Sequence, residues 1–187
     1  MRDEEQIRER ILTGAREQFE RFGLRKTTMD DIAKSIGMGK SSIYYYYKSK
    51  DDIFDSVLDD EMLKLRYAVD KEVQQKKDLA EKLIAYSTTY FAEVVPRQTL
   101  YRIVNQEDQE AGSKTRLKKI IGVEVEYMKT ILAGDIPQNT ADADLQTFAE
   151  AIISAMYGVM HYSFMINDNM NEKRFEQMMR SLMQMLV

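Results

Sequence analysis

The chain has 187 residues, a formal net charge of −4, and a composition that is 44% apolar and 31% charged, which is typical of a globular protein. It contains no cysteine and a single histidine, so disulfides and thiolate chemistry are excluded and a transition-metal site is not expected. No apolar signal segment opens the sequence, and the longest uncharged run, residues 151–167, is shorter than the ~20 residues of a membrane helix. We therefore expect a cytoplasmic protein without a membrane partner.

Residues 4–22 are predicted to form the first helix, which ends at Gly23. The apolar stripe of this helix has helical spacing and consists of Ile7, Ile11, Leu12, Ala15, Phe19 and Phe22. We expect the stripe to cover the short helices that follow and to hold them in shape.

Residues 27–54 are predicted to contain a short helix, a tight turn, a second short helix and the start of a third. Thr27 or Thr28 can cap the first of these helices, and Gly37 can end it because glycine readily adopts the left-handed conformation. Residues 40–47 then form the second helix at a steep angle. This order is that of a helix-turn-helix, whose second helix enters the DNA major groove, although periodicity alone fits an ordinary helical hairpin equally well.

The side chains of the second helix suit DNA. Polar groups at its start can reach base edges, tyrosine hydroxyls can bind phosphate, and lysines add positive charge at its far end. The predicted DNA-binding residues are Thr28, Lys40, Ser41, Ser42, Tyr44, Tyr45, Tyr46, Lys48 and Lys50. Residues 1–50 have a net charge of +3 (11 Lys/Arg, 8 Asp/Glu) and the remainder has −7, as expected of a DNA-binding head on a separate body. The predicted domains are therefore 1–50 and 51–187.

The body is predicted to be entirely helical. Apolar periodicity and the breaks at proline and glycine indicate helices at about 51–76, 79–95, 97–110, 114–133 and 142–166, and a final helix that carries Phe175 to Leu186. The whole chain is therefore predicted to be all-α, with a three-helix head and about nine helices in total. The helix at 142–166 is apolar nearly all round, which indicates burial on most sides.

The stretch from Thr27 to Phe54 resembles the DNA-binding signature of the tetracycline-repressor (TetR) family of bacterial transcription regulators. The matching residues are Thr27, Thr28, Met29, Ile32, Ala33, Ile36, Gly37, Ile43, Tyr44, Tyr46, Ser49, Lys50 and Ile53 or Phe54. Tyr47 stands where phenylalanine is usual, and Gly39 stands where serine or another polar residue is common, which slightly weakens the start of the second helix. Beyond residue 60 the likeness is one of helical architecture and not of motif.

This resemblance implies a small-molecule pocket in the body and a homodimer. The candidate effector residues are Tyr86, Tyr90, Phe91, Tyr101, Tyr127, Met128, Met156, Tyr157 and His161. Each of them also fits ordinary core or interface packing. The last two helices carry the candidate dimer residues, which are Phe148, Ile152, Ala155, Val159, Tyr162, Phe175, Met178, Met179 and Leu182. The alternative is that these two helices simply close a monomeric core.

We therefore expect a sequence-specific, homodimeric repressor that a small apolar or aromatic effector releases from its operator. The alternative is an orphan regulator that binds DNA without a small-molecule effector and is controlled by a protein partner. The sequence has no nucleophile elbow, phosphate loop, metal-ligand set or Rossmann glycine pattern. We accordingly expect no enzyme, no catalytic or metal-binding residues, and no cofactor.

Overall fold

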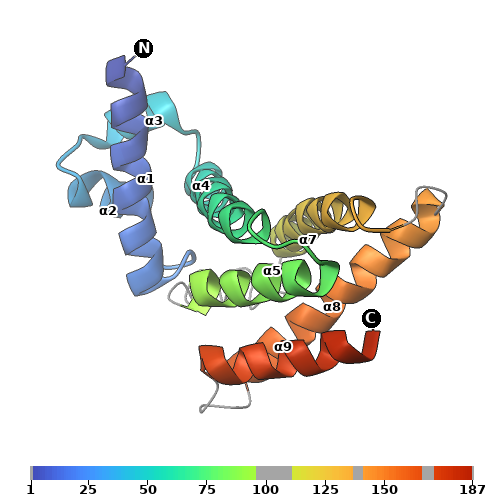
Figure 1. Ribbon diagram of the computed structural model, residues 1–187. Coiled ribbons are helices and arrows are strands. Elements are labelled where there is room, and N and C mark those ends of the chain that lie inside the picture. The colour runs from blue at the N-terminus through green and yellow to red at the C-terminus, as the bar shows by residue number, and fades with distance from the viewer. Residues whose placement is uncertain (1, 96–110, 137–140, 166–170, 187) are drawn as a thin grey trace. The chain divides into compact units, whose positions relative to one another are not determined.

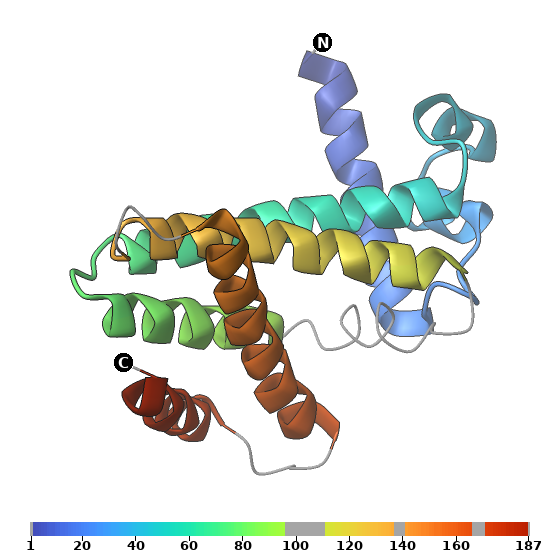
Figure 2. The ribbon, with the colours of Figure 1, turned by 90° about the vertical axis from the view of Figure 1, so that its right-hand side faces the viewer.

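The computed structural model describes residues 2–95, 111–136, 141–165 and 171–186 (Figures 1 and 2). Within these ranges every regular element is a helix. The eight helices are α1 (Arg2–Phe22), α2 (Met29–Ser35), α3 (Lys40–Tyr46), α4 (Lys50–Val73), α5 (Leu79–Val94), α7 (Ala111–Ala133), α8 (Asp142–Met165) and α9 (Glu172–Leu186). The all-α prediction is confirmed, and about nine expected helices agree with these eight. The helix predicted at 97–110 lies outside the described residues.

The chain separates into two compact units. Unit 1 comprises Met1–Lys64 and Arg97–Arg116, and unit 2 comprises Leu65–Pro96 and Leu117–Val187. The division falls inside α4 and inside α7, so each of these helices contributes its first part to unit 1 and its second part to unit 2.

The core of unit 1 is built from the apolar stripe of α1 and the inner faces of α2, α3 and α4. Ile11 and Phe19 of α1 are fully buried, as are Ile32 of α2 and Ile43 of α3. The rings of Phe19 and Phe54 meet edge to face, with centroids 5.2 Å apart, a favoured geometry for aromatic pairs. The predicted role of α1 as a cover for the short helices is therefore confirmed.

Three glycines shape unit 1. Gly23 and Gly37 have φ values of 77° and 66°, so both predicted helix ends use the left-handed conformation that glycine adopts without strain. Gly14 has a different role, because a Cβ added there would lie 2.3 Å from Cγ2 of Ile36. The absence of a side chain at Gly14 therefore permits the close approach of α1 to the end of α2.

An ion-pair cluster joins α1 to α4 within unit 1. The Arg16 guanidinium lies 2.6 Å from Oδ2 of Asp60 and 2.8 Å from Oε1 of Glu61. Since the side chains of Arg16 and Glu61 are largely buried, this pairing is screened less by solvent than an exposed surface pair would be.

Unit 2 is organised around α5, whose buried residues face α9 and the other helices of the unit. The rings of Phe91 on α5 and Phe175 on α9 are stacked, with centroids 4.1 Å apart and an interplanar angle of 15°. Helix α8 runs obliquely to these two helices (Figures 1 and 2) and buries Ile152, Met156 and Met160. Among the described helices, none combines the length and apolar character needed to span a lipid bilayer.

Candidate DNA interface and effector body

Helix α3 presents the predicted DNA-binding side chains on its open face. Ile43 and Tyr47 are buried, whereas Lys40, Ser41 and Ser42 are exposed. The exposed side chains continue through Tyr44, which is 47% exposed, Tyr45, which is 77% exposed, and Lys48. In the part of the chain that the structure describes, neither lysine forms an ion pair. The helix therefore offers hydroxyl and ammonium donors to an external acceptor, as a recognition helix does.

Arg8 of α1 holds the far end of α3. Its guanidinium carbon lies 5.6 Å from the ring centroid of Tyr46 and 5.4 Å from that of Tyr47. Its Nη1 also donates to the Tyr46 carbonyl at 3.4 Å. Through these contacts Arg8 has a structural role, because they fix the last turn of α3 against α1.

Thr28 is used by the protein itself. Its hydroxyl oxygen accepts from the Asp31 backbone N–H at 3.2 Å, and the Asp31 carboxylate accepts from the Thr28 backbone N–H at 2.9 Å. This capping box begins α2. The hydrogen bonds from Thr28 lower the pKa of Asp31. A phosphate contact by Thr28 would therefore compete with a cap that is already formed.

Lys50 is likewise engaged within unit 1. Its ammonium donates to the backbone carbonyls of Leu24 at 2.8 Å, Arg25 at 3.3 Å and Thr27 at 3.1 Å. These three bonds match the three N–H donors of an ammonium group. We call this arrangement the Lys50 clamp; it ties the start of α4 to the loop between α1 and α2.

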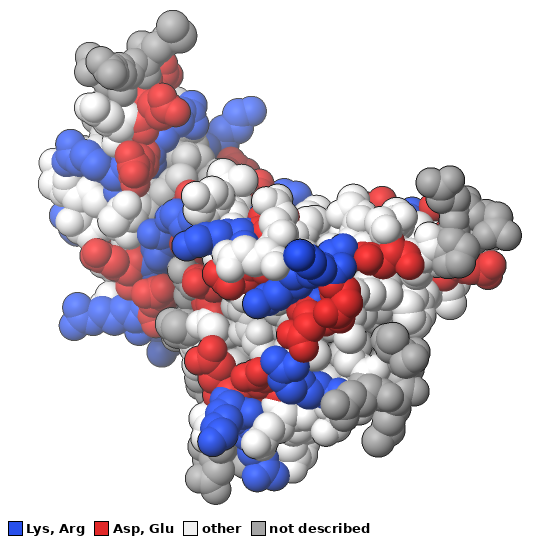
Figure 3. Space-filling model, viewed as in Figure 1, with Lys and Arg blue, Asp and Glu red and all other residues white. Residues whose placement is uncertain are grey.

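Within residues 23–50, four other cations remain available to a ligand. Arg25, Lys26, Lys40 and Lys48 are exposed and form no ion pair among the described residues. Lys34 differs, because Asp30 lies 2.6 Å away and raises the pKa of its ammonium. On the face of the molecule shown in Figure 3, basic and acidic side chains are interspersed, so an anion that approached this face would meet local cations and not a broad positive field.

In unit 2 four of the candidate effector tyrosines form one continuous ladder. The ring centroids of successive members lie 6.0, 5.9 and 6.0 Å apart in the order Tyr127, Tyr86, Tyr90, Tyr157. The hydroxyls of Tyr90 and Tyr157 are 2.7 Å apart. Tyr86 is fully buried, and burial is the main reason that its pKa is raised well above the ordinary value. The structure therefore brings together side chains from α5, α7 and α8.

The other candidate effector residues have different surroundings. Met128 and Met156 are fully buried in unit 2, and Phe91 is buried in its stack with Phe175. His161 is exposed on α8. Tyr101 lies outside the described residues.

Three charged residues beside the tyrosine ladder were not predicted. Glu124 is only 2% exposed; its Oε1 accepts from Arg66 at 3.0 Å and its Oε2 from the Tyr86 hydroxyl at 2.5 Å. Burial raises the pKa of Glu124, although Arg66 and Tyr86 favour its charged form. The Tyr127 hydroxyl donates to Asp70. No sequence signal separates these residues from solvated helix charges, because only their partners on other helices distinguish them.

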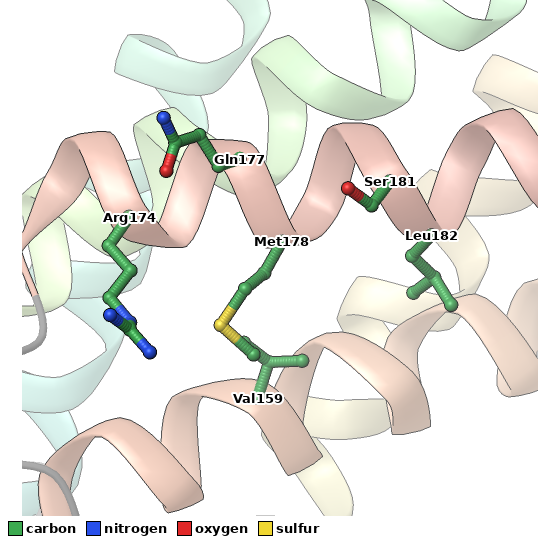
Figure 4. Close-up of a pocket in the computed structure, with 6 residues that line it drawn as sticks. All are labelled: Val159, Arg174, Gln177, Met178, Ser181 and Leu182. Carbon is green, nitrogen blue, oxygen red and sulfur yellow. The ribbon is translucent and has the colours of Figure 1, made fainter.

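The candidate dimer residues divide into an inner and an outer set. Ile152, Phe175 and Met179 are buried within unit 2. The outer set is half-buried or exposed and consists of Phe148, Ala155, Val159, Tyr162, Met178 and Leu182. Three of these, Val159, Met178 and Leu182, line a groove of about 490 Å³ together with Arg174, Gln177 and Ser181. Figure 4 shows Met178 of α9 reaching toward Val159 of α8.

The exposed side of α8 next to this groove is uncharged. It carries Ala151, Ser154, Gly158 and Tyr162, so mostly small side chains recur at helical spacing. Such a face permits another helix to approach closely. Within the described residues, no three histidine or acidic side chains gather as a metal site would require.

Known proteins resemble this chain most clearly in its head. Residues 11–57 match the family described as bacterial regulatory proteins, tetR family. The HTH-type transcriptional regulator YhgD from Bacillus subtilis is 37% identical over 70 residues, and the HTH-type transcriptional repressor SCO4008 from Streptomyces coelicolor is 32% identical over 112 residues. These matches cover 37% and 60% of this chain, and they span 32% and 55% of the two relatives.

Solved structures share the fold over nearly the whole chain. The transcriptional regulator FadR from Bacillus subtilis, in complex with stearoyl-CoA, has a TM-score of 0.75 and 18% identity, over 93% of this chain and 96% of its own. A regulator from Saccharomonospora viridis, in complex with choline, has a TM-score of 0.76 and 16% identity, over 96% of both chains. The likeness is one of fold, and each ligand belongs to the protein that holds it.

Proposed function

Because the chain belongs to the TetR family of bacterial regulatory proteins, we propose that it is a homodimeric repressor that binds operator DNA and leaves it when a small molecule binds unit 2. The single observation that carries the DNA-binding part is the open face of α3. Its lysines and hydroxyls have no acceptor among the described residues, while its inner residues anchor the helix to the head.

The proposed contacts follow from the surroundings of each side chain. Lys40, Ser41 and Ser42 lie at the start of α3 and read base edges, whereas Tyr44, Tyr45 and Lys48 bind phosphates. Tyr46 contributes to the interface while Arg8 holds its ring. Thr28 and Lys50 act indirectly, because their polar groups maintain the cap of α2 and the Lys50 clamp.

The proposed dimer is formed by α8 and α9. The uncharged outer face of α8 and the groove beside Met178 supply the surface, and two such helices from each protomer make a four-helix interface. A dimer also gives the spacing that two recognition helices need, which is about one DNA turn or ~34–36 Å for a palindromic site.

The proposed effector site lies at the tyrosine ladder. Aromatic faces and the neighbouring Met128 and Met156 suit an effector with apolar or aromatic groups. Two proteins of the same fold bind stearoyl-CoA and choline, which supports a ligand site in this body. Because these two ligands differ in chemistry, they do not define the chemical class of this chain's effector. An effector shifts the protein away from DNA if it binds the released state more tightly.

Selection from random duplex DNA with the purified protein, followed by a salt titration, tests this function. Enrichment of a palindrome with salt-sensitive affinity is the expected result. If the folded protein enriches no sequence, even after extraction of any bound small molecule, the helix-turn-helix is a scaffold and the proposal fails. If a palindrome is enriched but no compound releases it, the protein is instead a regulator controlled by a protein partner.

A further inference from the structure

Neither core packing nor DNA binding requires the buried carboxylate of Glu124. Glu124 is buried within unit 2, and both of its carboxylate oxygens are engaged, one by Arg66 and the other by the Tyr86 hydroxyl. A buried carboxylate is unfavourable unless it is paired. Its presence inside a proposed effector body therefore indicates a specific electrostatic role.

The cation that pairs with Glu124 also stacks on an aromatic ring. The guanidinium carbon of Arg66 lies 3.5 Å from the centroid of the Tyr127 ring. Because the Tyr127 hydroxyl donates to Asp70, the phenol is polarised and its π face becomes more negative. Carboxylate and ring together form the environment that proteins use for organic cations.

From this geometry we infer that Glu124, Tyr86 and Tyr127 form a recognition site for an organic cation, which the chain's own Arg66 occupies in the absence of ligand. The inference rests on the proposed function and names the effector class of the same site. An incoming guanidinium or ammonium group takes the place of the Arg66 guanidinium, which moves toward solvent.

Arg66 is suited to such an exchange. Its side chain is 20% exposed, so it borders water while its guanidinium points inward. Among the described residues its buried Nη1 has no hydrogen-bond partner, so the internal cation leaves some of its own donors unsatisfied there. A ligand cation that needs fewer acceptors can therefore compete with it.

The charge of the cluster selects against other effectors. The cluster contains two carboxylates and one guanidinium: Glu124 pairs with Arg66, and Asp70 accepts from the Tyr127 hydroxyl. A fatty acid or phosphate that reached Glu124 would therefore meet net negative charge. A neutral ligand that displaced Arg66 would leave Glu124 buried without a counter-charge. Only a cation keeps the carboxylate paired throughout the exchange.

A pocket at the surface of unit 2 touches one residue of the proposed site, Tyr127. The pocket, of about 370 Å³, opens against Asp70 and Tyr127, and its walls include Val73, Thr130 and Ile131. Two lysines, Lys76 and Lys82, also line the pocket, and the Lys82 ammonium is paired with Asp135 at 2.5 Å. The pocket thus reaches the Tyr127 ring from solvent, whereas Glu124, Tyr86 and Arg66 are not among its lining residues.

An isosteric pair of probes tests the inference. Calorimetric titration of the full chain at pH 8 would compare phenylguanidinium, phenylurea as its neutral isostere, and laurate as an anion. We expect phenylguanidinium to bind at least about ten-fold more tightly than the other two, as a paired and stacked cation should. Equal binding of phenylurea, or tighter binding of laurate, would overturn the inference.

Three variants locate the binding site. Glu124→Gln removes the charge and should weaken phenylguanidinium by about ten-fold, whereas Arg66→Gln removes the internal competitor and should strengthen it by a similar factor. Glu126→Gln is the matched control, because Glu126 is exposed on the same helix. If Glu124→Gln does not fold, Arg66→Gln still decides, since misfolding cannot increase affinity. Unchanged affinity in Arg66→Gln would refute the displacement of Arg66.

Failure of the inference is separable from failure of the proposed function. A protein that selects a palindrome but binds no phenylguanidinium remains a DNA-binding regulator with another effector, and the cation site is then rejected. A protein that binds phenylguanidinium through Glu124 but selects no DNA retains the cation site without the proposed regulation. Release of the selected palindrome by phenylguanidinium would support both.

Discussion

At the residue scale, the head contains two kinds of polar side chain: some are hydrogen-bonded within the protein, and others are exposed and available to a ligand. Thr28 and Lys50 belong to the first kind, because each has its hydrogen bonds completed by neighbouring backbone or carboxylate groups. Tyr44 and Lys40 belong to the second kind. Substitutions in the two sets should therefore affect stability and DNA affinity separately.

Replacement of Tyr44 by phenylalanine tests a phosphate contact. Tyr44→Phe should weaken DNA binding by about 1 kcal/mol per protomer, equally for all sequences, because a phosphate hydrogen bond carries no sequence information. Titrations against a panel of operator variants would measure this, with Tyr67→Phe, at an exposed tyrosine of α4, as the control. A changed site preference with intact overall affinity would contradict the role, and such a change is instead expected of Lys40→Ala.

Two glycines of the turn before α3 should respond oppositely to substitution. Gly39 has φ −72° and ψ 144°, and a new Cβ there would make only ordinary van der Waals contact, 3.7 Å from Oγ of Ser42. Gly39→Ser should therefore stabilise the head by about 0.5–1 kcal/mol through capping and reduced unfolded-state entropy. Gly37 has φ 66°, so Gly37→Ala should destabilise it by about 1–2 kcal/mol. Hydrogen exchange of the α2 and α3 amides would report both; stabilisation by Gly37→Ala would be incompatible with the left-handed turn.

At the element scale, the close packing of α1 against the end of α2 depends on the absence of a side chain at Gly14. Gly14→Ala would place its Cβ within 2.3 Å of Ile36 and should destabilise unit 1 by about 1–3 kcal/mol, despite the better helix propensity of alanine. Urea unfolding monitored by circular dichroism would measure the change. Gly122→Ala is the control, since Gly122 is exposed in α7 with open space around it and should gain stability. Equal stabilisation by both variants would mean that α1 can move away from α2 at little cost.

The helices themselves were largely predictable, because their apolar stripes have one period and their ends carry glycine or a capping residue. Helix α1 was predicted to within its first turn, and the cap at Thr28 and the break at Gly37 were anticipated. The interaction partners of the charged residues, in contrast, could not be predicted from the sequence. The charge of Lys50 predicts a DNA contact, but the sequence does not reveal the carbonyls that Lys50 meets, which come from the loop more than twenty residues earlier.

In the effector body, too, the sequence does not reveal which side chains meet across different helices. The tyrosines of the ladder were named as candidates from a family resemblance, and the structure brings four of them together. Glu124 was missed because Glu124 and Glu126 look alike on one helix, and only Arg66 and Tyr86 on other helices make the first a buried, paired carboxylate. Tertiary neighbours, which periodicity does not encode, decide such sites.

At the scale of the whole molecule, the number of available cations in the helix-turn-helix segment, residues 23–50, sets the salt dependence of DNA binding. With four cations in each head and two heads in a dimer, replacement of counterions at every one gives a slope of about −7 for log K against log salt concentration. Filter-binding or anisotropy titrations from low to moderate salt would measure it. A slope of only about −2 would mean that the heads do not dock through Arg25, Lys26, Lys40 and Lys48.

The proposed dimer can be tested by placing a charge on its uncharged face. Tyr162 is 42% exposed on α8, and Tyr162→Asp should convert the dimer to monomer because an aspartate buried in an apolar interface has no partner. Sedimentation equilibrium would give the mass, and Tyr67→Asp introduces the same change at an exposed tyrosine outside the interface. Monomeric wild-type protein, or a dimer that survives Tyr162→Asp, would exclude this interface.

The attachment of α4 to the head constrains how the head can be grafted in protein engineering. In a chimera joined to a foreign body at residue 50, Lys50 would keep its carbonyls but Arg16 would lose Asp60 and Glu61, the two carboxylates that pair with it. A junction after Lys64 retains both sets of contacts. The transplantable segment therefore includes the first half of α4, and a fusion that ended at residue 50 would leave Arg16 without its two carboxylate partners.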